Sequence, residues 1–210
     1  IFSGIKTINA QWVQQTNATG FYLQDIHYVN SSVGYAVGEG VSKTTNGGNN
    51  WVLVTDPSPS FTEIAVHFID ANTGFVGNDG VSATTNGGEN WVSTLSGVGV
   101  NDFSFINSTT GWFATQVGRI YKTINGGVSW FMLVDLAPHF QSIIFVNSNT
   151  GWVCGNGGVI YKSTDGGGSW NSQTSGVAAD LRNITFSDVN NGYAVGNGGT
   201  IIRTTNGGDN

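Results

Sequence analysis

Two aspartates, Asp25 and Asp102, are the residues of this chain that could act as a catalytic carboxylate pair. Two carboxyl groups about 5 to 10 Å apart hydrolyse glycosidic bonds when one serves as acid and the other as base or nucleophile. Both aspartates occupy the same place in a repeated sequence, on alternate repeats. Because duplication explains their alignment as well as catalysis does, the sequence predicts no catalytic residue.

The histidines and the single cysteine are the other groups with possible chemistry. His27 and His67 are equivalent positions in adjacent repeats, and no His-x-His or His-Glu-x-x-His pattern accompanies them. The sequence therefore predicts no metal site and no cofactor. Cys154 stands where other repeats have valine or alanine, which predicts a buried strand thiol rather than a nucleophile.

A turn phrase of eight residues positions all of these groups, and its first copy runs from Thr44 to Trp51. It returns at 84–91, 123–130 and 163–170 and begins again at Thr204. Asn-Gly is a strong hairpin signal because a type I′ turn needs positive φ, which Asn tolerates and Gly adopts freely. The Asn and Thr side chains can also bond nearby backbone. The predicted structural residues of these turns are Asn46, Trp51, Asn86, Trp91, Asn125, Trp130, Asp165, Trp170 and Asn206.

The turn phrase resembles the Asp-box, Ser/Thr-x-Asp-x-Gly-x-Thr/Ser-Trp, of the BNR repeat propellers. Together with the preceding Gly-aromatic-x-Val-Gly-x-Gly-Gly-x-Ile-Tyr-Lys-Thr wording, as in 151–163, it is most similar to the photosystem II assembly factor-like propellers of bacterial secreted proteins. The resemblance covers about 11–210 and implies a β-propeller. Only Asp165 keeps the family's aspartate, which weakens a metal or acid role but leaves the turn role intact.

Asp-box relatives also include sialidases and other glycoside hydrolases, so a carbohydrate-active enzyme is the alternative function. A sialidase-like site, as that resemblance implies, needs three arginines on the substrate carboxylate. This chain has only Arg119, Arg182 and Arg203, and they are dispersed. The photosystem II assembly factors present an arginine-rich patch to their partner, which three dispersed arginines do not reproduce. The family's binding role is therefore expected here with a different, unidentified protein or glycan partner.

Composition and charge are those of a turn-rich sheet protein. Charged residues make up 10% of the chain against a usual ~25%, and 32 of 210 residues are glycine. A net charge of -6 argues against nucleic acid and anionic membrane surfaces, which require clustered Lys and Arg. No apolar run is long enough to span a membrane. Lys43, Lys122, Lys162 and Arg203 stand one per repeat just before the turn, and we expect them to stack on the neighbouring Trp.

The spacing of the repeats predicts the fold. Trp12, Trp51, Trp91, Trp130 and Trp170 follow one another at 39 or 40 residues, the length of a four-stranded propeller blade. We expect an all-β propeller of five blades over 11–210, each with strands A to D from the channel outward. Because the last turn lacks its Trp and Trp12 lacks its turn, the N-terminal strand is expected to pair with the C-terminal blade and close the ring.

The first ten residues read in two ways. Ile1–Ala10 resembles the tail of a bacterial secretory signal, which would make the protein secreted or extracytoplasmic, or it forms an ordinary N-terminal arm. We expect a monomer.

The starts of the five A strands are the predicted binding site. These residues should ring one mouth of the channel together with the links between strands B and C, which carry Glu39, Asp79, Gln116 and Asn156. Most are polar and differ between blades, as an asymmetric ligand requires; a water-filled mouth without ligand is the alternative. The candidate binding residues are Gln24, Asp25, Asn101, Asp102, Gln141, Arg182 and Asn183.

Overall fold

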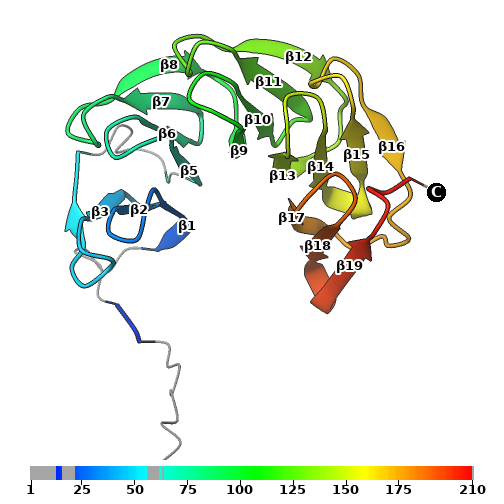
Figure 1. The fold of residues 1–210 in the computed structure, drawn as a ribbon, viewed down its shortest axis with the longest axis horizontal. Coiled ribbons are helices and arrows are strands. Elements are labelled where there is room, and N and C mark those ends of the chain that lie inside the picture. The colour runs from blue at the N-terminus through cyan, green and yellow to red at the C-terminus, as the bar shows by residue number, and fades with distance from the viewer. Residues whose placement is uncertain (1–12, 16–21, 56–61, 63, 210) are drawn as a thin grey trace, which may run out of the picture.

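The protein is a series of antiparallel sheets, each built from one sequence repeat. The computed structural model describes residues 13–15, 22–55, 62 and 64–209, and the statements below refer to these residues. Four sheets have four strands, and the fifth has three among the described residues. We call them blades 1 to 5 in chain order. Figure 1 shows them as an arc with blades 1 and 5 at its ends. The predicted all-β propeller of five blades is confirmed.

The strands of each blade pair in the predicted order A, B, C, D. The innermost A strands are β1 (Leu23–Tyr28), β5 (Ala65–Phe68), β9 (Val100–Phe105), β13 (Phe140–Phe145) and β17 (Leu181–Phe186). The B strands are β2 (Gly34–Gly38), β6 (Gly74–Gly77), β10 (Gly111–Thr115), β14 (Gly151–Gly155) and β18 (Gly192–Gly196). The C strands are β3 (Val41–Thr44), β7 (Gly80–Thr84), β11 (Arg119–Thr123), β15 (Ile160–Ser163) and β19 (Thr200–Thr204). The D strands are β4 (Val52–Leu53), β8 (Val92–Ser96), β12 (Phe131–Asp135) and β16 (Asn171–Gln173).

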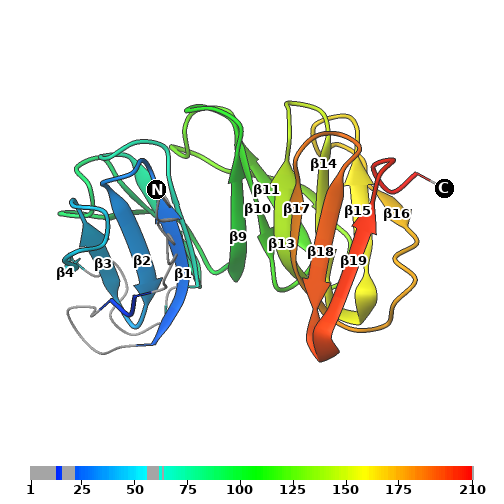
Figure 2. The same ribbon diagram turned by 60° about the horizontal axis from the view of Figure 1, so that its bottom comes forward.

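The core consists of separate hydrophobic clusters, one at each joint between neighbouring blades. The period-2 pattern of the strands turns one face of each sheet toward each neighbour, so both faces are apolar. At all four joints a strand B ring stacks on the strand A ring of the next blade. The distances between ring centres are 3.4 Å for Tyr35 on Phe68, 5.1 Å for Phe75 on Phe105, 3.7 Å for Trp112 on Phe145 and 3.6 Å for Trp152 on Phe186. Figure 2 shows the successive A strands β9, β13 and β17 side by side.

The arrangement gives the molecule two rims. The A strands begin, and the B–C links lie, at the rim that we call the link rim. The repeated turns between C and D lie at the opposite rim, the turn rim. The short 3-10 turns η1 (Asn156–Gly158) and η2 (Asn197–Gly199) are B–C links of blades 4 and 5.

Closure of the ring by the N-terminal strand stays a prediction. Trp12 and the expected signal remnant 1–10 lie outside the described residues. Val13–Gln15 carry no strand, and Gln15 borders a groove on blade 1 with Leu23 and Tyr28.

Candidate functional site: the two rims

β-Bulges distinguish the link-rim ends of four A strands. The pairing of A with B skips one residue in blades 1, 3, 4 and 5, whereas blade 2 pairs without a skip. A bulge leaves one residue outside the ladder and turns its side chain away from the regular positions. The skipped residues are Gln24, Asn101, Gln141 and Arg182. Four of the predicted binding residues therefore share one special backbone position.

A polar network joins blades 4 and 5 at this rim. Gln141 Nε2 donates to Asn156 Oδ1 at 3.0 Å, and the Gly157 amide donates to Asp180 Oδ1 at 2.8 Å. Arg182 Nε donates to Asn197 Oδ1 at 3.0 Å, and its guanidinium lies 3.7 Å from Asp180 Oδ2. Arg182 is about half exposed, with a side-chain exposure of 51%, so donors remain for a ligand.

The other bulged residues differ in what they contact. Asn101 Nδ2 donates to the carbonyl of Phe140 at 2.6 Å and so links blades 3 and 4. Gln24 is exposed, as is Asn183 beside Arg182. The link rim therefore offers free polar groups chiefly from Gln24, Arg182 and Asn183.

Asp25 and Asp102 hold neighbouring blades together. Asp25 Oδ2 accepts the Val66 amide of blade 2 at 2.9 Å. Asp102 Oδ2 accepts the Ser142 hydroxyl at 2.7 Å and the Ile143 amide at 2.9 Å, both of blade 4. These two carboxylates therefore have a structural use, and their role in ligand binding stays a prediction.

Burial shifts the pKa of both carboxyl groups. Desolvation raises the pKa of Asp102 to about 7, against hydrogen bonds from Ser142 and Ile143 that lower it and repulsion from Asp25 that adds to the rise. Desolvation also raises the pKa of Asp25. Cys154 is fully buried, as predicted, and burial raises the pKa of its thiol to about 12, so the thiol is unreactive.

The two histidines lie together in an aromatic cluster, with their rings tilted at 47° to each other. The His27 and His67 rings lie 4.5 Å apart, and His67 stacks on Phe105 at 4.9 Å. Burial lowers the pKa of His67 to about 3 and also lowers the pKa of His27. No group of three or more metal-ligating residues occurs in the described part of the chain.

The three arginines do not converge. Arg119 pairs with Asp135 at 2.9 Å, and Arg203 lies 5.8 Å from the centre of the Tyr193 ring. Since Arg182 contacts Asn197 instead, each arginine has a different partner and no triad forms. No helix among the described residues is long and apolar enough to cross a membrane.

The repeated turns on the opposite rim are stabilised by their own side chains. In the first copy Thr44 Oγ1 accepts the Gly48 amide at 2.9 Å, and Asn46 Oδ1 accepts the Asn50 amide at 2.9 Å. The positive φ angles fall on the glycine pair, 71° at Gly47 and 91° at Gly48. The expected positive φ of the asparagine is wrong, because its side chain acts as an acceptor for the turn and glycine alone takes the left-handed backbone. Asp165 accepts the same bonds, and those from Ser169 lower its pKa to about 2.

Three of the repeated turns, those of blades 2, 4 and 5, are also held by the blade that precedes them. Trp112 Nε1 and Lys122 Nζ of blade 3 both donate to the Gly166 carbonyl of blade 4, at 3.0 and 3.1 Å. We call this pair of donors, a strand B aromatic and a strand C lysine, the joint clamp. The lysines were expected to stack on the Trp of the turn. They lie instead over the strand B ring of their own blade, as Lys122 does over Trp112.

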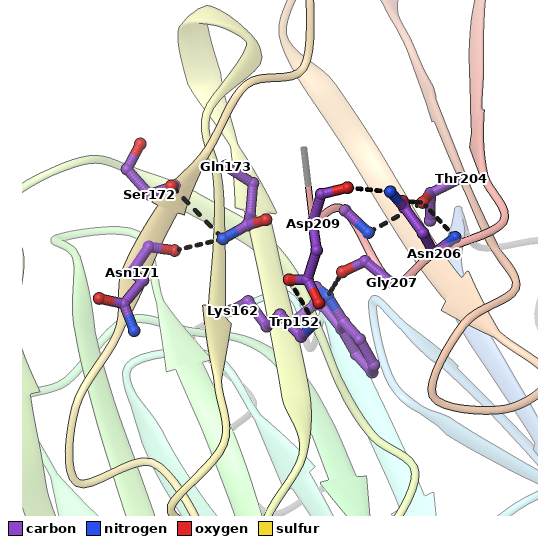
Figure 3. A network of polar contacts seen from close by, with 10 residues as sticks. Trp152, Lys162, Asn171, Ser172, Gln173, Thr204, Asn206, Gly207 and Asp209 are labelled. Atoms are coloured by element: carbon purple, nitrogen blue, oxygen red, sulfur yellow. Dashed lines mark hydrogen bonds and ion pairs between the residues drawn. The ribbon is translucent and has the colours of Figure 1, made fainter.

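Related contacts occur at the joint between blades 4 and 5 and at the joint between blades 1 and 2. Trp152 Nε1 donates to the Gly207 carbonyl at 3.0 Å, and Lys162 Nζ contacts Asp209 Oδ1 at 2.7 Å, as Figure 3 shows. In blade 1, Lys43 Nζ donates to the Gly87 carbonyl at 3.1 Å, with the Tyr35 hydroxyl 3.4 Å from the same oxygen. Sequence reasoning missed the clamp because donor and acceptor lie more than 40 residues apart, in different repeats.

The Trp that closes each turn packs edge-on against the strand A ring of its own blade. Trp51 meets Tyr28, Trp91 meets Phe68 and Trp170 meets Phe145, with ring centres 5.7 to 6.2 Å apart. Trp130 likewise meets Phe105 at 5.8 Å. Each of these tryptophans is partly buried, and its structural role stays a prediction.

The chain is similar to a known protein family and to several solved structures. Residues 136–205 match the model of the photosynthesis system II assembly factor YCF48 family. Among solved structures, YCF48 bound to D1 peptide has a TM-score of 0.71 at 20% identity, covering 89% of this chain and 66% of that one. YCF48 from Cyanidioschyzon merolae has a TM-score of 0.70 at 16% identity, covering 91% and 72%. A search of curated proteins gave no match.

A glycoside hydrolase has a similar fold. The GH74 enzyme of Niastella koreensis gives a TM-score of 0.74 at 18% identity, over 89% of this chain and 37% of that one. The chain thus spans about a third of that enzyme and about two thirds of the D1-bound YCF48. The chain is a five-bladed β-propeller, and both its matched segment 136–205 and its fold are similar to those of the photosystem II assembly factor YCF48.

Proposed function

We propose that this chain is a non-catalytic binding propeller that recognises a protein partner at the link rim. The observation that carries the proposal is the set of four bulged A-strand residues, which are all polar and comprise two glutamines, an asparagine and an arginine. The pairing of strands A and B does not require the four skipped residues to be polar, whereas a binding surface uses polar side chains that lie outside the ladder. The YCF48 structure with a bound D1 peptide supports a protein partner for this fold.

The exposed part of the link rim has the chemistry to bind extended peptide. Arg182 donates to carbonyl or carboxylate oxygens, and the amides of Gln24 and Asn183 both donate and accept. The Asp180 carboxylate, one-third exposed, offers an acceptor beside Arg182. Polar side chains of this kind pair with the main-chain groups of a partner segment.

The test compares the two rims. A variant with Gln24, Arg182 and Asn183 all changed to Ala is screened against the parent on an array of 15-residue peptides. Loss of the peptides that the parent binds supports the proposal. Retained binding, with loss in a variant changed at Asn49, Glu89 and Val128, would assign the site to the turn rim and overturn it.

The alternative function is glycoside hydrolysis, to which the similarity with GH74 enzymes points. Asp25 and Asp102 each accept a backbone amide of the next blade, which favours a structural role. We therefore propose that xyloglucan and sialosides are not turned over. Hydrolysis that disappears in Asp25→Asn or Asp102→Asn, with the fold retained, would contradict this. A glycan array run beside the peptide array separates a glycan partner from a protein partner.

We also propose an extracytoplasmic location, on the resemblance of Ile1–Ala10 to the end of a secretory signal. N-terminal sequencing of the protein isolated from its native cells tests it. A start at Gln11 is expected, and a cytoplasmic protein retaining Ile1–Ala10 would contradict it.

A further inference from the structure

The joint between blades 2 and 3 lacks the clamp that the other joints have. Phe75 stands where the other blades have Tyr35, Trp112 or Trp152, and its ring has no donor. In the ladder Phe75 pairs with Ala83, as Trp112 pairs with Lys122 and Trp152 with Lys162. The lysine of this joint is therefore missing, and an alanine takes its place.

The outer strand leaves further space at the same joint. Val54 of blade 1 and Leu133 of blade 3 pack against the second turn glycine of the following blade, Gly88 and Gly167. The residue at the same position in blade 2 is the smaller Thr94. The joint between blades 2 and 3 therefore has neither the lysine nor the bulky apolar side chain of the neighbouring joints.

A groove of about 470 Å³ occupies this place, within the usual range for ligand sites. Phe75, Ala83 and Thr94 of blade 2 line it together with Gly126 and Gly127 of the blade 3 turn. Val92 and Val128, exposed by 67% and 75%, form its lips. No charged side chain is among the residues that line it.

Two polar groups at this joint have no partner within the described chain. The Gly126 carbonyl, counterpart of the clamped carbonyls of Gly87 and Gly166, accepts no side-chain donor, and Gly126 is more exposed than those two glycines. The buried indole N–H of Trp130 is also unpaired. By contrast the Trp91 indole donates to the Thr55 carbonyl at 2.8 Å.

We propose that this groove, hereafter the 2–3 groove, binds a lysine side chain of a partner protein. The lysine stem lies along the Phe75 ring, and its ammonium donates to the Gly126 carbonyl, as Lys122 does to Gly166 over Trp112. In Figure 3 the corresponding lysine of blade 4, Lys162, donates to the Asp209 carboxylate, while Trp152 donates to the Gly207 carbonyl. A cation over an aromatic face is attractive, more so where water is excluded.

The charges around the groove select a cation. Its polar lining is uncharged and includes Thr85, Asn86 and Asn90, and the exposed Glu89 is next to Asn90 in the chain. The chain as a whole carries a net charge of -6. The acidic charge of the chain and the Gly126 carbonyl therefore favour a cationic side chain, and lysine is the cation that the neighbouring joints use. This site lies on the turn rim, so it is independent of the link-rim site proposed above.

The experiment titrates the isotope-labelled 210-residue chain with acetyl-Val-Lys-Val-amide and follows its backbone amides by NMR. Saturable shifts are expected at Gly126, Gly127 and Val92. The matched probe acetyl-Val-norleucine-Val-amide has nearly the same stem without the charge and should bind about tenfold more weakly. Raising the salt concentration should weaken only the lysine peptide. Equal binding of the two peptides, or shifts confined to other residues, would overturn the proposal.

Two variants test the position. Ala83→Lys supplies the missing lysine from within the chain and should reduce peptide binding by at least about tenfold. Thr94→Leu introduces the side chain that blade 3 has at the equivalent position, Leu133, and blocks the apolar part of the groove without adding charge. It therefore tests the position of the peptide if Ala83→Lys does not fold. The Gln24, Arg182 and Asn183 variant should bind the lysine peptide like the parent. Unchanged binding in Ala83→Lys and Thr94→Leu would place the peptide elsewhere and refute the 2–3 groove.

Discussion

The Lys122 ammonium lies 3.1 Å from the Gly166 carbonyl oxygen and 4.9 Å from the centre of the Trp112 ring. One side chain thus links the outer part of blade 3 to the turn of blade 4. The same contact recurs in blade 1 with Lys43 and Gly87. Much of the polar bonding between blades depends on groups that point toward the next repeat in the chain.

Lys122→Met keeps the stem over Trp112 and removes the charged donor. We expect the free energy of unfolding to fall by ~1 to 2 kcal/mol, since hydrogen bonds from charged groups contribute about this much and the site is partly solvated. Urea unfolding measures it. Arg203→Met is the control, because Arg203 is exposed and clamps no turn among the described residues. A larger loss in the control than in Lys122→Met would contradict the clamp.

Asp102 should make the free energy of unfolding fall as the pH rises, the opposite of the usual effect of a carboxyl group. Its pKa is about 7 in the folded protein and about 3.9 in an unfolded chain, so the folded state binds the additional proton. The stability it contributes is full below pH ~4 and is lost as the pH rises to about 7, by at most ~1.4 kcal/mol per pH unit. The difference in unfolding free energy between the parent and Asp102→Asn should therefore fall from pH 4.5 to 7.5. A difference that is constant with pH would disprove the shift.

His67 acts in the opposite direction. Its pKa is about 3 when folded and about 6.5 when unfolded, so its contribution is full above pH 6.5 and is lost as the pH falls toward 3. His67→Phe retains a ring between His27 and Phe105 and cannot take up a proton. We expect the variant to gain stability over the parent progressively below pH 6.5. At pH 8 the comparison reports packing alone and serves as the control. A parallel pair of curves would be incompatible with a neutral buried His67.

Trp12 tests the closure of the ring. If it completes blade 5 beside β19, Trp12→Ala should lower the unfolding free energy by ~3 to 5 kcal/mol, as truncation of a core Trp does. Trp91→Ala is the matched variant, since Trp91 closes a turn and packs on Phe68. Melting of Trp12→Ala at the parent temperature, with Trp91→Ala clearly destabilised, would exclude closure by this strand.

The blades could be predicted from the sequence because each feature of a blade is determined by residues a few positions apart. These features are the alternating apolar residues, the Asx turn, the Gly-rich link and the turn phrase. The turn at Thr44 is an example, since its side-chain bonds all lie within four residues. The Asn-Gly signal predicts left-handed φ at Asn46 and Gly47, whereas the structure has it at Gly47 and Gly48, because this turn is longer than the two-residue hairpin that the signal describes.

The candidate site could be predicted only in part. The sequence shows that the starts of the A strands are polar. It does not show that the side chains of Gln24 and Asp25 point in different directions, because a β-bulge adds a residue without changing the residue types around it. The Asp25 carboxylate bonds Val66, 41 residues on, and no pattern within a repeat indicates this partner. The 2–3 groove arises from three separate substitutions, at Phe75, Ala83 and Thr94, which gain meaning only when the joints are compared in three dimensions.

The missing clamp also gives the joint between blades 2 and 3 a different temperature dependence. That joint is held mainly by the hydrocarbon of Phe75, Phe103, Phe113 and Tyr121, whereas its neighbours add donors on carbonyl oxygens. Attraction between apolar surfaces weakens on cooling, and hydrogen bonding to charged groups does not share this loss. We therefore expect cooling to weaken this joint more than the joints on either side of it.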